Sequence, residues 1–231
     1  MSVTAASSTA TFSADELIVE SNDGKQYRLG AFSKTIDLAT TGAGGIDAAP
    51  APVTGYVALY VIYDPATSTA ALIATDATAA AAPEIYGGSS MPAGYTASAL
   101  VSVWSVAASK FKVGVQRGRR VTTAPISLLN TSSPATTITA LSTLSGAPLN
   151  AREIMLYEVV TQSTPGVGIS LYTYPDTSGV QSGTCNATAS QGITTSVVNF
   201  SVYVSNPGNI YYKMLNTNPG QSVINSLGYE I

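Results

Sequence analysis

The stretch Gly55-Tyr56-Val57-Ala58-Leu59-Tyr60-Val61-Ile62-Tyr63-Asp64 is the densest run of β-branched and aromatic residues in the first half of the chain. Such side chains pack well on a pleated sheet and lose rotamer freedom in a helix, so the run predicts a strand. Alternate residues of a strand point to opposite faces, and neither face of this one is polar. We therefore expect a strand covered on both sides, which ends at Asp64-Pro65 and returns through residues 70–74.

Further strand patterns surround this hairpin. Asn22-Asp23-Gly24 separates two short apolar runs and predicts a tight turn, because Asp and Gly both tolerate positive φ. A flexible leader is expected up to about Phe12, another short strand at 33–39 and a loop at 76–92. Residues 97–105 and 110–116 should pair across a short turn, and three residues of the second segment should share its inner face: Phe111, Val113 and Val115.

The second half carries its own set of strand signals, and none of its segments has a helical period. The clearest alternation places Val198, Phe200, Val202 and Val204 on one face. Short strands separated by Gly, Pro, Asn and Ser are typical of a β-sandwich or jelly roll. We predict an all-β protein of two such domains, residues 1–121 and 122–231, joined by a hinge at 121–125, with second-domain strands near 152–162, 169–174, 195–205, 210–215 and 223–231.

Composition limits the classes of partner. Only 10% of the 231 residues are charged, against about 25% in ordinary globular domains, so part of the surface is expected to meet other subunits. The net charge of −3 gives no reason to expect a nucleic-acid partner. Half of the ten basic residues lie between 110 and 120, where a solvated strand face with arginines pairing carboxylates is the favoured interpretation.

The sequence contains few motifs that indicate a cellular location or a catalytic site. No basic segment followed by an apolar core opens the chain, and no run reaches 18 apolar residues, so we expect synthesis in a cytoplasm without membrane insertion. The chain has no histidine, which removes Ser-His-Asp and Cys-His catalysis, and Cys185 is a single cysteine. Glu153 and Glu158 share one predicted strand with opposite parity, so they should not form a glycosidase pair. We predict no enzyme activity, no cofactor and no metal site.

Several short motifs, taken in order, resemble the fibre and receptor-binding proteins of tailed bacteriophages and prophages. The resemblance covers roughly the first 121 residues and the last five. It rests on six segments: Ala14-Asp15-Glu16-Leu17-Ile18-Val19, Gly44-Gly45-Ile46-Asp47, Tyr60-Val61-Ile62-Tyr63, Met91-Pro92-Ala93-Gly94-Tyr95, Gln116-Arg117-Gly118-Arg119-Arg120 and Leu227-Gly228-Tyr229-Glu230-Ile231.

This resemblance implies a virion protein, usually a homotrimer, that binds a bacterial surface glycan or protein. Residues 1–121 would then attach to other virion proteins, and residues 122–231 would form the distal receptor-binding domain. Two alternatives stay open: a polysaccharide depolymerase of the tailspike kind, and a head fibre or decoration protein without a receptor role.

Receptor contacts in such proteins fall on loops at the ends of rigid sheets. Tyr174, Asp176 and Tyr211 lie in or beside the aromatic turns expected in the second domain. A tyrosine ring suits a sugar face, and an aspartate can accept hydrogen bonds from sugar hydroxyls. We predict that these three residues contribute to the receptor site; the alternative is that the tyrosines belong to the core or to a subunit interface.

Overall fold

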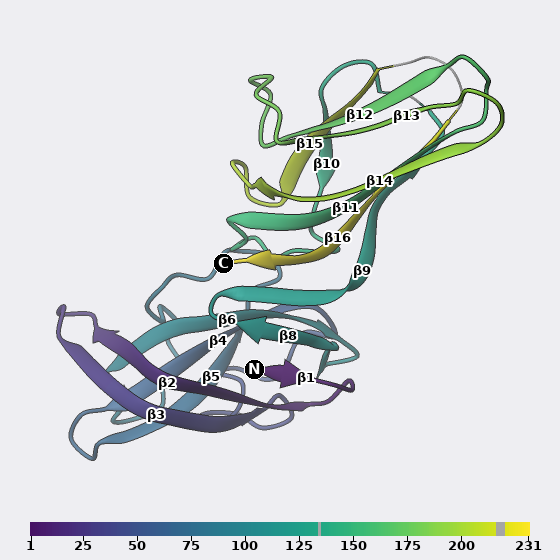
Figure 1. Ribbon diagram of the computed structural model, residues 1–231. Coiled ribbons are helices and arrows are strands. Elements are labelled where there is room, and N and C mark those ends of the chain that lie inside the picture. Colours follow the sequence, from purple (N-terminus) through teal and green to yellow (C-terminus); the bar gives the residue numbers. More distant parts are fainter. Residues whose placement is uncertain (134, 216–219) are drawn as a thin grey trace. The chain divides into compact units, whose positions relative to one another are not determined.

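The computed structural model describes residues 1–133, 135–215 and 220–231. These residues contain no helix, and hence none that could cross a bilayer, and their strands form antiparallel sheets, which confirms the predicted all-β class. The chain divides into two compact units. The first comprises Met1–Val121 with Pro148–Asn150, and the second comprises Thr122–Ala147 with Ala151–Ile231 (Figure 1).

The first unit is built on a sheet in the order β3-β2-β6-β4-β5, with β7 also paired to β6. A separate two-residue strand, β1, pairs with β8. The strands of this unit are β1 (Ser2–Val3), β2 (Thr9–Ser21), β3 (Gln26–Asp37), β4 (Thr54–Asp64), β5 (Thr69–Asp76), β6 (Ala97–Ala107), β7 (Lys110–Phe111) and β8 (Gly114–Arg117).

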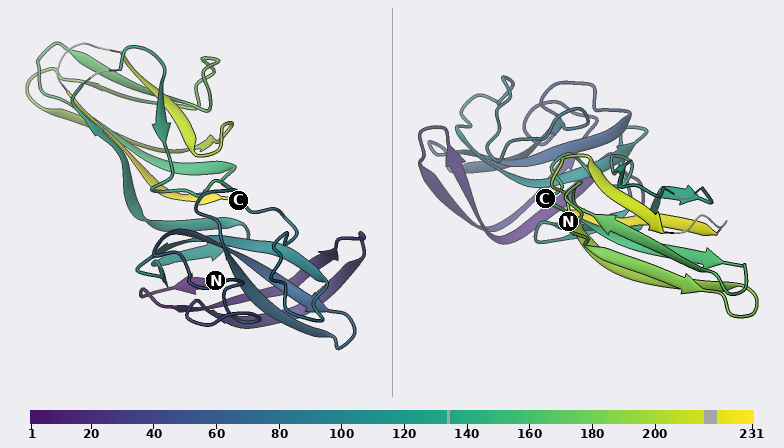
Figure 2. Two further views of the ribbon diagram at one scale, coloured as in Figure 1. Left: turned by 180° about the vertical axis from the view of Figure 1, so that it is seen from behind. Right: turned by 90° about the horizontal axis from the view of Figure 1, so that it is seen from above.

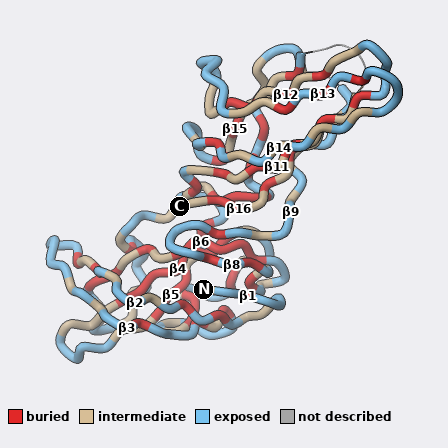
Figure 3. The backbone as a smooth tube through the Cα atoms, in the orientation of Figure 1, coloured by how far each residue is buried: buried red, intermediate tan, exposed pale blue. Residues whose placement is uncertain are grey.

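Strand β4 forms the centre of the first unit, as its sequence predicts. It pairs with β5 on one side and β6 on the other, and every residue from Val57 to Ile62 is fully buried. The buried section is drawn red in Figure 3. Trp104 of β6 packs in the same core, and its indole Nε1 donates to the Lys112 carbonyl at 2.8 Å. The expectation that both faces of this strand are covered is therefore confirmed.

The Asp23-Gly24 turn also forms as predicted, with Gly24 at a φ of 81°. It joins strands much longer than their local sequence suggests, because the run expected as a separate strand at 33–39 is the continuation of β3. Strand β2 pairs with β3 along most of its length but with β6 only at Glu20↔Ser98 and Ser21↔Ala97. The hairpin turn is thus brought beside the start of β6.

Two expectations for the first unit are wrong. The leader is not flexible, because β1 pairs with β8 and Val3, Ala10 and Phe12 are buried. The segment 110–116 is not one strand facing β6, because it breaks into β7 and β8 and the alternation changes phase. Val113 and Val115 are consequently 50% and 43% exposed, whereas Gln116 is buried.

The second unit contains two antiparallel sheets. One has the order β9-β16-β11-β14 within this unit, and the other has the order β10-β15-β12-β13. Strand β11 also contacts β12 and β13, so the two sheets pack face to face as a sandwich (Figure 2). The strands are β9 (Arg120–Thr131), β10 (Thr139–Ser142), β11 (Glu153–Gln162), β12 (Gly168–Tyr174), β13 (Gly183–Thr188), β14 (Thr194–Tyr203), β15 (Asn209–Leu215) and β16 (Gln221–Glu230).

The hinge expected at 121–125 coincides with the division between the two units, but the segment is a strand and not a loop. These residues lie inside β9, which begins in the first unit at Arg120 and continues into the second. Pro125 lies within this strand and is exposed. Proline has no backbone N–H, so a strand tolerates it only where no neighbouring strand needs that hydrogen-bond donor. The predicted strands of the second half are present, but β10, β13 and the second-unit part of β9 were not expected.

Candidate functional site

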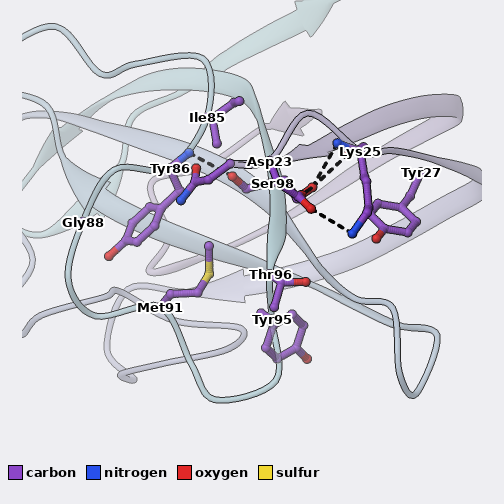
Figure 4. Close-up of a pocket in the computed structure, with 12 residues that line it drawn as sticks. Asp23, Lys25, Tyr27, Ile85, Tyr86, Gly88, Met91, Tyr95, Thr96 and Ser98 are labelled. Carbon is purple, nitrogen blue, oxygen red and sulfur yellow. Dashed lines mark hydrogen bonds and ion pairs between the residues drawn. The ribbon is translucent and has the colours of Figure 1, made fainter.

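The candidate site is an open pocket of the first unit with a volume of about 550 Å³. Three segments far apart in the sequence line it: the β2–β3 turn, the loop that precedes β6, and the beginning of β6 itself. Their meeting follows from the short pairing of β2 with β6, which ends at the turn. Figure 4 shows the side chains around this pocket.

An ion pair marks the polar side of the pocket (Figure 4). Lys25 Nζ lies 2.8 Å from Asp23 Oδ2, and Ser21 Oγ donates to Asp23 Oδ1 at 2.5 Å. The hydrogen bonds from Lys25 and then from Ser21 lower the pKa of Asp23 to about 2, and Asp23 in turn raises the pKa of Lys25. Both groups are therefore charged at neutral pH, exposed, and able to bond a polar ligand.

Aromatic and apolar side chains complete the lining of the pocket. Tyr27 packs against Tyr63 with ring centroids 5.3 Å apart. Tyr95, Met91 and Ile85 are half-buried in the pocket lining. Half-buried rings and a thioether thus share one lining with a charged pair, and this combination of apolar and polar groups suits a sugar ring.

Tyr86 fixes the base of the pocket. Its hydroxyl donates to Asp47 Oδ2 at 2.8 Å, its backbone N–H donates to Ser98 Oγ at 2.8 Å, and its ring meets Tyr60 edge-on at 5.4 Å. Burial, together with that bond to Asp47, raises the pKa of Tyr86 to about 12. Gly88 allows the loop to pass, because a Cβ there would lie only 2.3 Å from the Tyr86 hydroxyl oxygen. The loop is thus held against the sheet rather than free.

The pocket contains a hydroxyl beside a carboxylate, Ser21 and Asp23, but this pair is poorly suited to catalysis. A general base needs a pKa near the working pH, and the ion pair holds Asp23 far below it. Asp23 would accept a hydroxyl proton only at a large energetic cost. The arrangement favours binding over proton transfer.

The three receptor residues predicted from sequence lie in the second unit. Tyr174 and Tyr211 are cross-strand partners in β12 and β15, so both lie within strands and not in the expected turns. Tyr174 is only 6% exposed, whereas Tyr211 is half-buried and its hydroxyl accepts from Asn206 Nδ2 at 3.3 Å. Asp176 follows β12, and its carboxylate accepts from the Ser178 N–H at 2.8 Å. The structure brings the three to one end of the β12–β15 pair, and their receptor role stays a prediction.

Among the carboxyl groups of the described residues, the one with the most strongly shifted pKa lies away from both sites. Glu158 of β11 is fully buried inside the sandwich, and burial raises its pKa to about 7 although Thr173 Oγ1 donates to its Oε1. The sequence predicts that Glu153 and Glu158 face opposite sides of one strand. The structure agrees, because Glu158 is buried whereas Glu153 of the same strand is only half-buried. A carboxyl enclosed by the sandwich cannot reach a substrate, so its pKa has no catalytic meaning here.

The basic residues between 110 and 120 do not form an anion site around Arg119. Its guanidinium Nη2 lies 3.0 Å from both carboxylate oxygens of Glu84, which supports the expected pairing of arginine with a nearby carboxylate.

Sequence reasoning identified the turn at Asp23-Gly24 and the segment Met91–Tyr95 separately but assigned binding to neither. The signal that joins them is tertiary, because about 70 residues separate them in the chain. No protein-family model matches the chain, and no curated protein sequence matches it.

Proposed function

We propose that this chain is a non-enzymatic fibre or receptor-binding subunit of a bacteriophage particle, and that it binds a glycan on the bacterial surface. The observation that carries the proposal is the pocket of the first unit, which is lined both by Tyr27, Tyr95 and Met91 and by the Asp23–Lys25 pair. Sugars present both apolar C–H faces and hydroxyl rims, which such a surface matches. The resemblance of the first 121 residues to phage fibre proteins supports the virion context.

The same resemblance supports a homotrimer attached to other virion proteins through the first unit, and that attachment would use a surface of the unit other than the pocket. The low proportion of charged residues, 10%, supports self-association in general but not the number three. Light scattering on the intact chain would measure the number of copies. A depolymerase is not favoured, because Asp23 has a strongly lowered pKa and Glu158 is enclosed in the sandwich.

The test compares the pocket with the site predicted in the second unit. Tyr95→Ala removes one ring from the pocket, and Tyr211→Ala removes one from the end of the β12–β15 pair. Adsorption to host cells and binding to an array of bacterial surface glycans would be measured for both, with near-ultraviolet circular dichroism as the control for folding. Loss in Tyr95→Ala alone supports the pocket.

Loss in Tyr211→Ala alone would move the receptor site to the second unit and remove the pocket from consideration. Unchanged binding in both variants, or no binding by the wild-type chain to any surface glycan, would contradict the proposal.

A further inference from the structure

The edges of the sheets differ in how they are protected against pairing with another strand. An exposed edge offers unpaired N–H and C=O groups, and soluble proteins block it with charges, proline, bulges, covering segments or very short strands. Among the strands in the described ranges, six lie at the ends of the sheet orders: β1, β3, β5, β10, β13 and β14.

Five of these edges are protected or short. Strand β3 carries Arg28 and Lys34 and is distorted at Ala31, which has a φ of 50°. Strand β5 is covered by residues 44–47: the Gly44 N–H donates to the Leu72 carbonyl at 2.7 Å, and the Asp47 N–H donates to the Ala74 carbonyl at 2.8 Å. Strands β1, β10 and β13 have two, four and six residues.

Strand β14 lacks a charge, a proline and a bulge; β13 packs against its inner face at Phe200, but no backbone hydrogen bond among the described residues reaches its open edge. It is ten residues long, TTSVVNFSVY, without a charge, a proline or a glycine. Its register with β11 runs one to one over ten residue pairs without a bulge. A long, regular and uncharged edge of this kind is a template for another strand.

The backbone groups on the free side of β14 can be assigned. In an antiparallel pair every second residue bonds to its neighbour, and the Val204 N–H donates to the Arg152 carbonyl at 2.8 Å. The even-numbered residues of β14 therefore bond to β11. The N–H and C=O groups that point to the open edge belong to Thr195, Val197, Asn199, Ser201 and Tyr203.

We propose that β14 pairs antiparallel with β14 of a second copy of this chain, about a twofold axis at Asn199. The five open-edge residues are symmetric about Asn199: in this register Val197 lies opposite Ser201 of the other copy, and Thr195 opposite Tyr203. All five pairs are of the hydrogen-bonded kind, which gives about ten main-chain hydrogen bonds.

A second copy fits this edge better than a charged partner does. The five side chains carry no charge, so the copies do not repel each other and a charged segment would find no opposite charge. Val197 is 50% exposed and Tyr203 is 71% exposed, and both would gain cover from a continuous sheet. An interface of this type is isologous and closes after two copies. If the chain also forms trimers, as proposed above, β14–β14 pairing would join one trimer to another.

The decisive variant is Asn199→Pro, since proline removes an N–H that points to the open edge and leaves the bonds to β11 in place. Asn199→Ala is the matched control because it keeps that N–H. Masses would be measured by light scattering in a concentration series reaching about 200 µM. We expect the wild type and Asn199→Ala to contain an even number of 23.6 kDa chains, and Asn199→Pro to have half that mass or a dissociation constant raised at least about tenfold.

Cysteine cross-linking tests the register. Paired residues lie about 5.5 Å apart between Cα atoms, which a disulfide spans, so Asn199→Cys should form a disulfide-linked dimer under mild oxidation. Val197→Cys should not, because its two copies would lie about 14 Å apart along the strands. An odd number of chains in the wild type, an unchanged mass of Asn199→Pro, or equal cross-linking of the two cysteine variants would overturn the proposal. Glycan binding by the first unit is measured separately, so its failure leaves this result unaffected.

Discussion

Glu158 should make the stability of the second unit depend on pH. The pKa of this carboxyl is about 7 in the folded protein, against an ordinary value of 4.5, because burial disfavours the charged form. Between these two pH values the folded state binds more protons than the unfolded state, so the free energy of unfolding falls as pH rises from about 4.5 to about 7. A difference of this size corresponds to about 3 kcal/mol, or a change of about hundredfold in the opening equilibrium.

The single cysteine provides an assay specific to the second unit. Cys185 is buried on β13, with its Sγ 3.9 Å from the Glu158 backbone carbonyl oxygen, so a thiol reagent reaches it only when the sandwich opens. Labelling rates would be measured from pH 5 to 7.5 and divided by the rates for the urea-unfolded chain, which removes the pH dependence of the thiol itself. The corrected rate should rise by about hundredfold over this range in the wild type.

Glu158→Gln keeps the shape of the side chain but cannot ionise. Its corrected labelling rate should be independent of pH between 5 and 7.5, whatever its absolute stability. Asp176→Asn is the control. Hydrogen bonds from Ser178 lower the pKa of the Asp176 carboxyl, so its contribution to the free energy of unfolding is lost only as pH falls through the acidic range. This variant should therefore keep the pH dependence of the wild type between pH 5 and 7.5. Equal pH dependence in the wild type and Glu158→Gln would refute the assignment, and Trp104 fluorescence should show that the first unit does not follow the same pH curve.

Two further predictions concern the first unit. Gly55→Ala should lower its free energy of unfolding by at least about 2 kcal/mol, since Gly55 has a φ of 136° and a Cβ there would lie 2.2 Å from Thr78 Oγ1. Gly87→Ala, whose Cβ would meet nothing closer than 3.6 Å, is the control; urea denaturation followed by Trp104 fluorescence measures both, and equal losses would contradict the steric argument. Limited proteolysis with a nonspecific enzyme should cut first in the loop between β5 and β6 and spare residues 120–131, because these residues are held in β9. Mass spectrometry would identify the first fragments. First cuts within residues 120–131 would contradict the prediction.

Local sequence was sufficient to predict a structural feature where the residues of one short segment determine it. The run from Val57 to Ile62 is apolar on both faces, so it could only be a covered strand, and Asp23-Gly24 supplies the positive φ that a tight turn needs. The alternation around Phe200 gave the correct inward and outward faces of β14. These features depend on a few neighbouring residues and on the period of two of a strand.

Features that depend on pairing between distant segments were decided only by the tertiary structure. Gln116 is buried because its Nε2 donates to the carbonyls of Val101 and Gly118, and no periodicity in residues 110–116 signals this. The pocket exists because β2 and β6 pair over two residues and bring Asp23 and Tyr95 into one lining. The open edge of β14 likewise follows from the order of strands in the sheet. A sequence pattern fixes which way a side chain points within its strand, whereas the neighbour that the strand receives depends on the free energy of the whole packed chain.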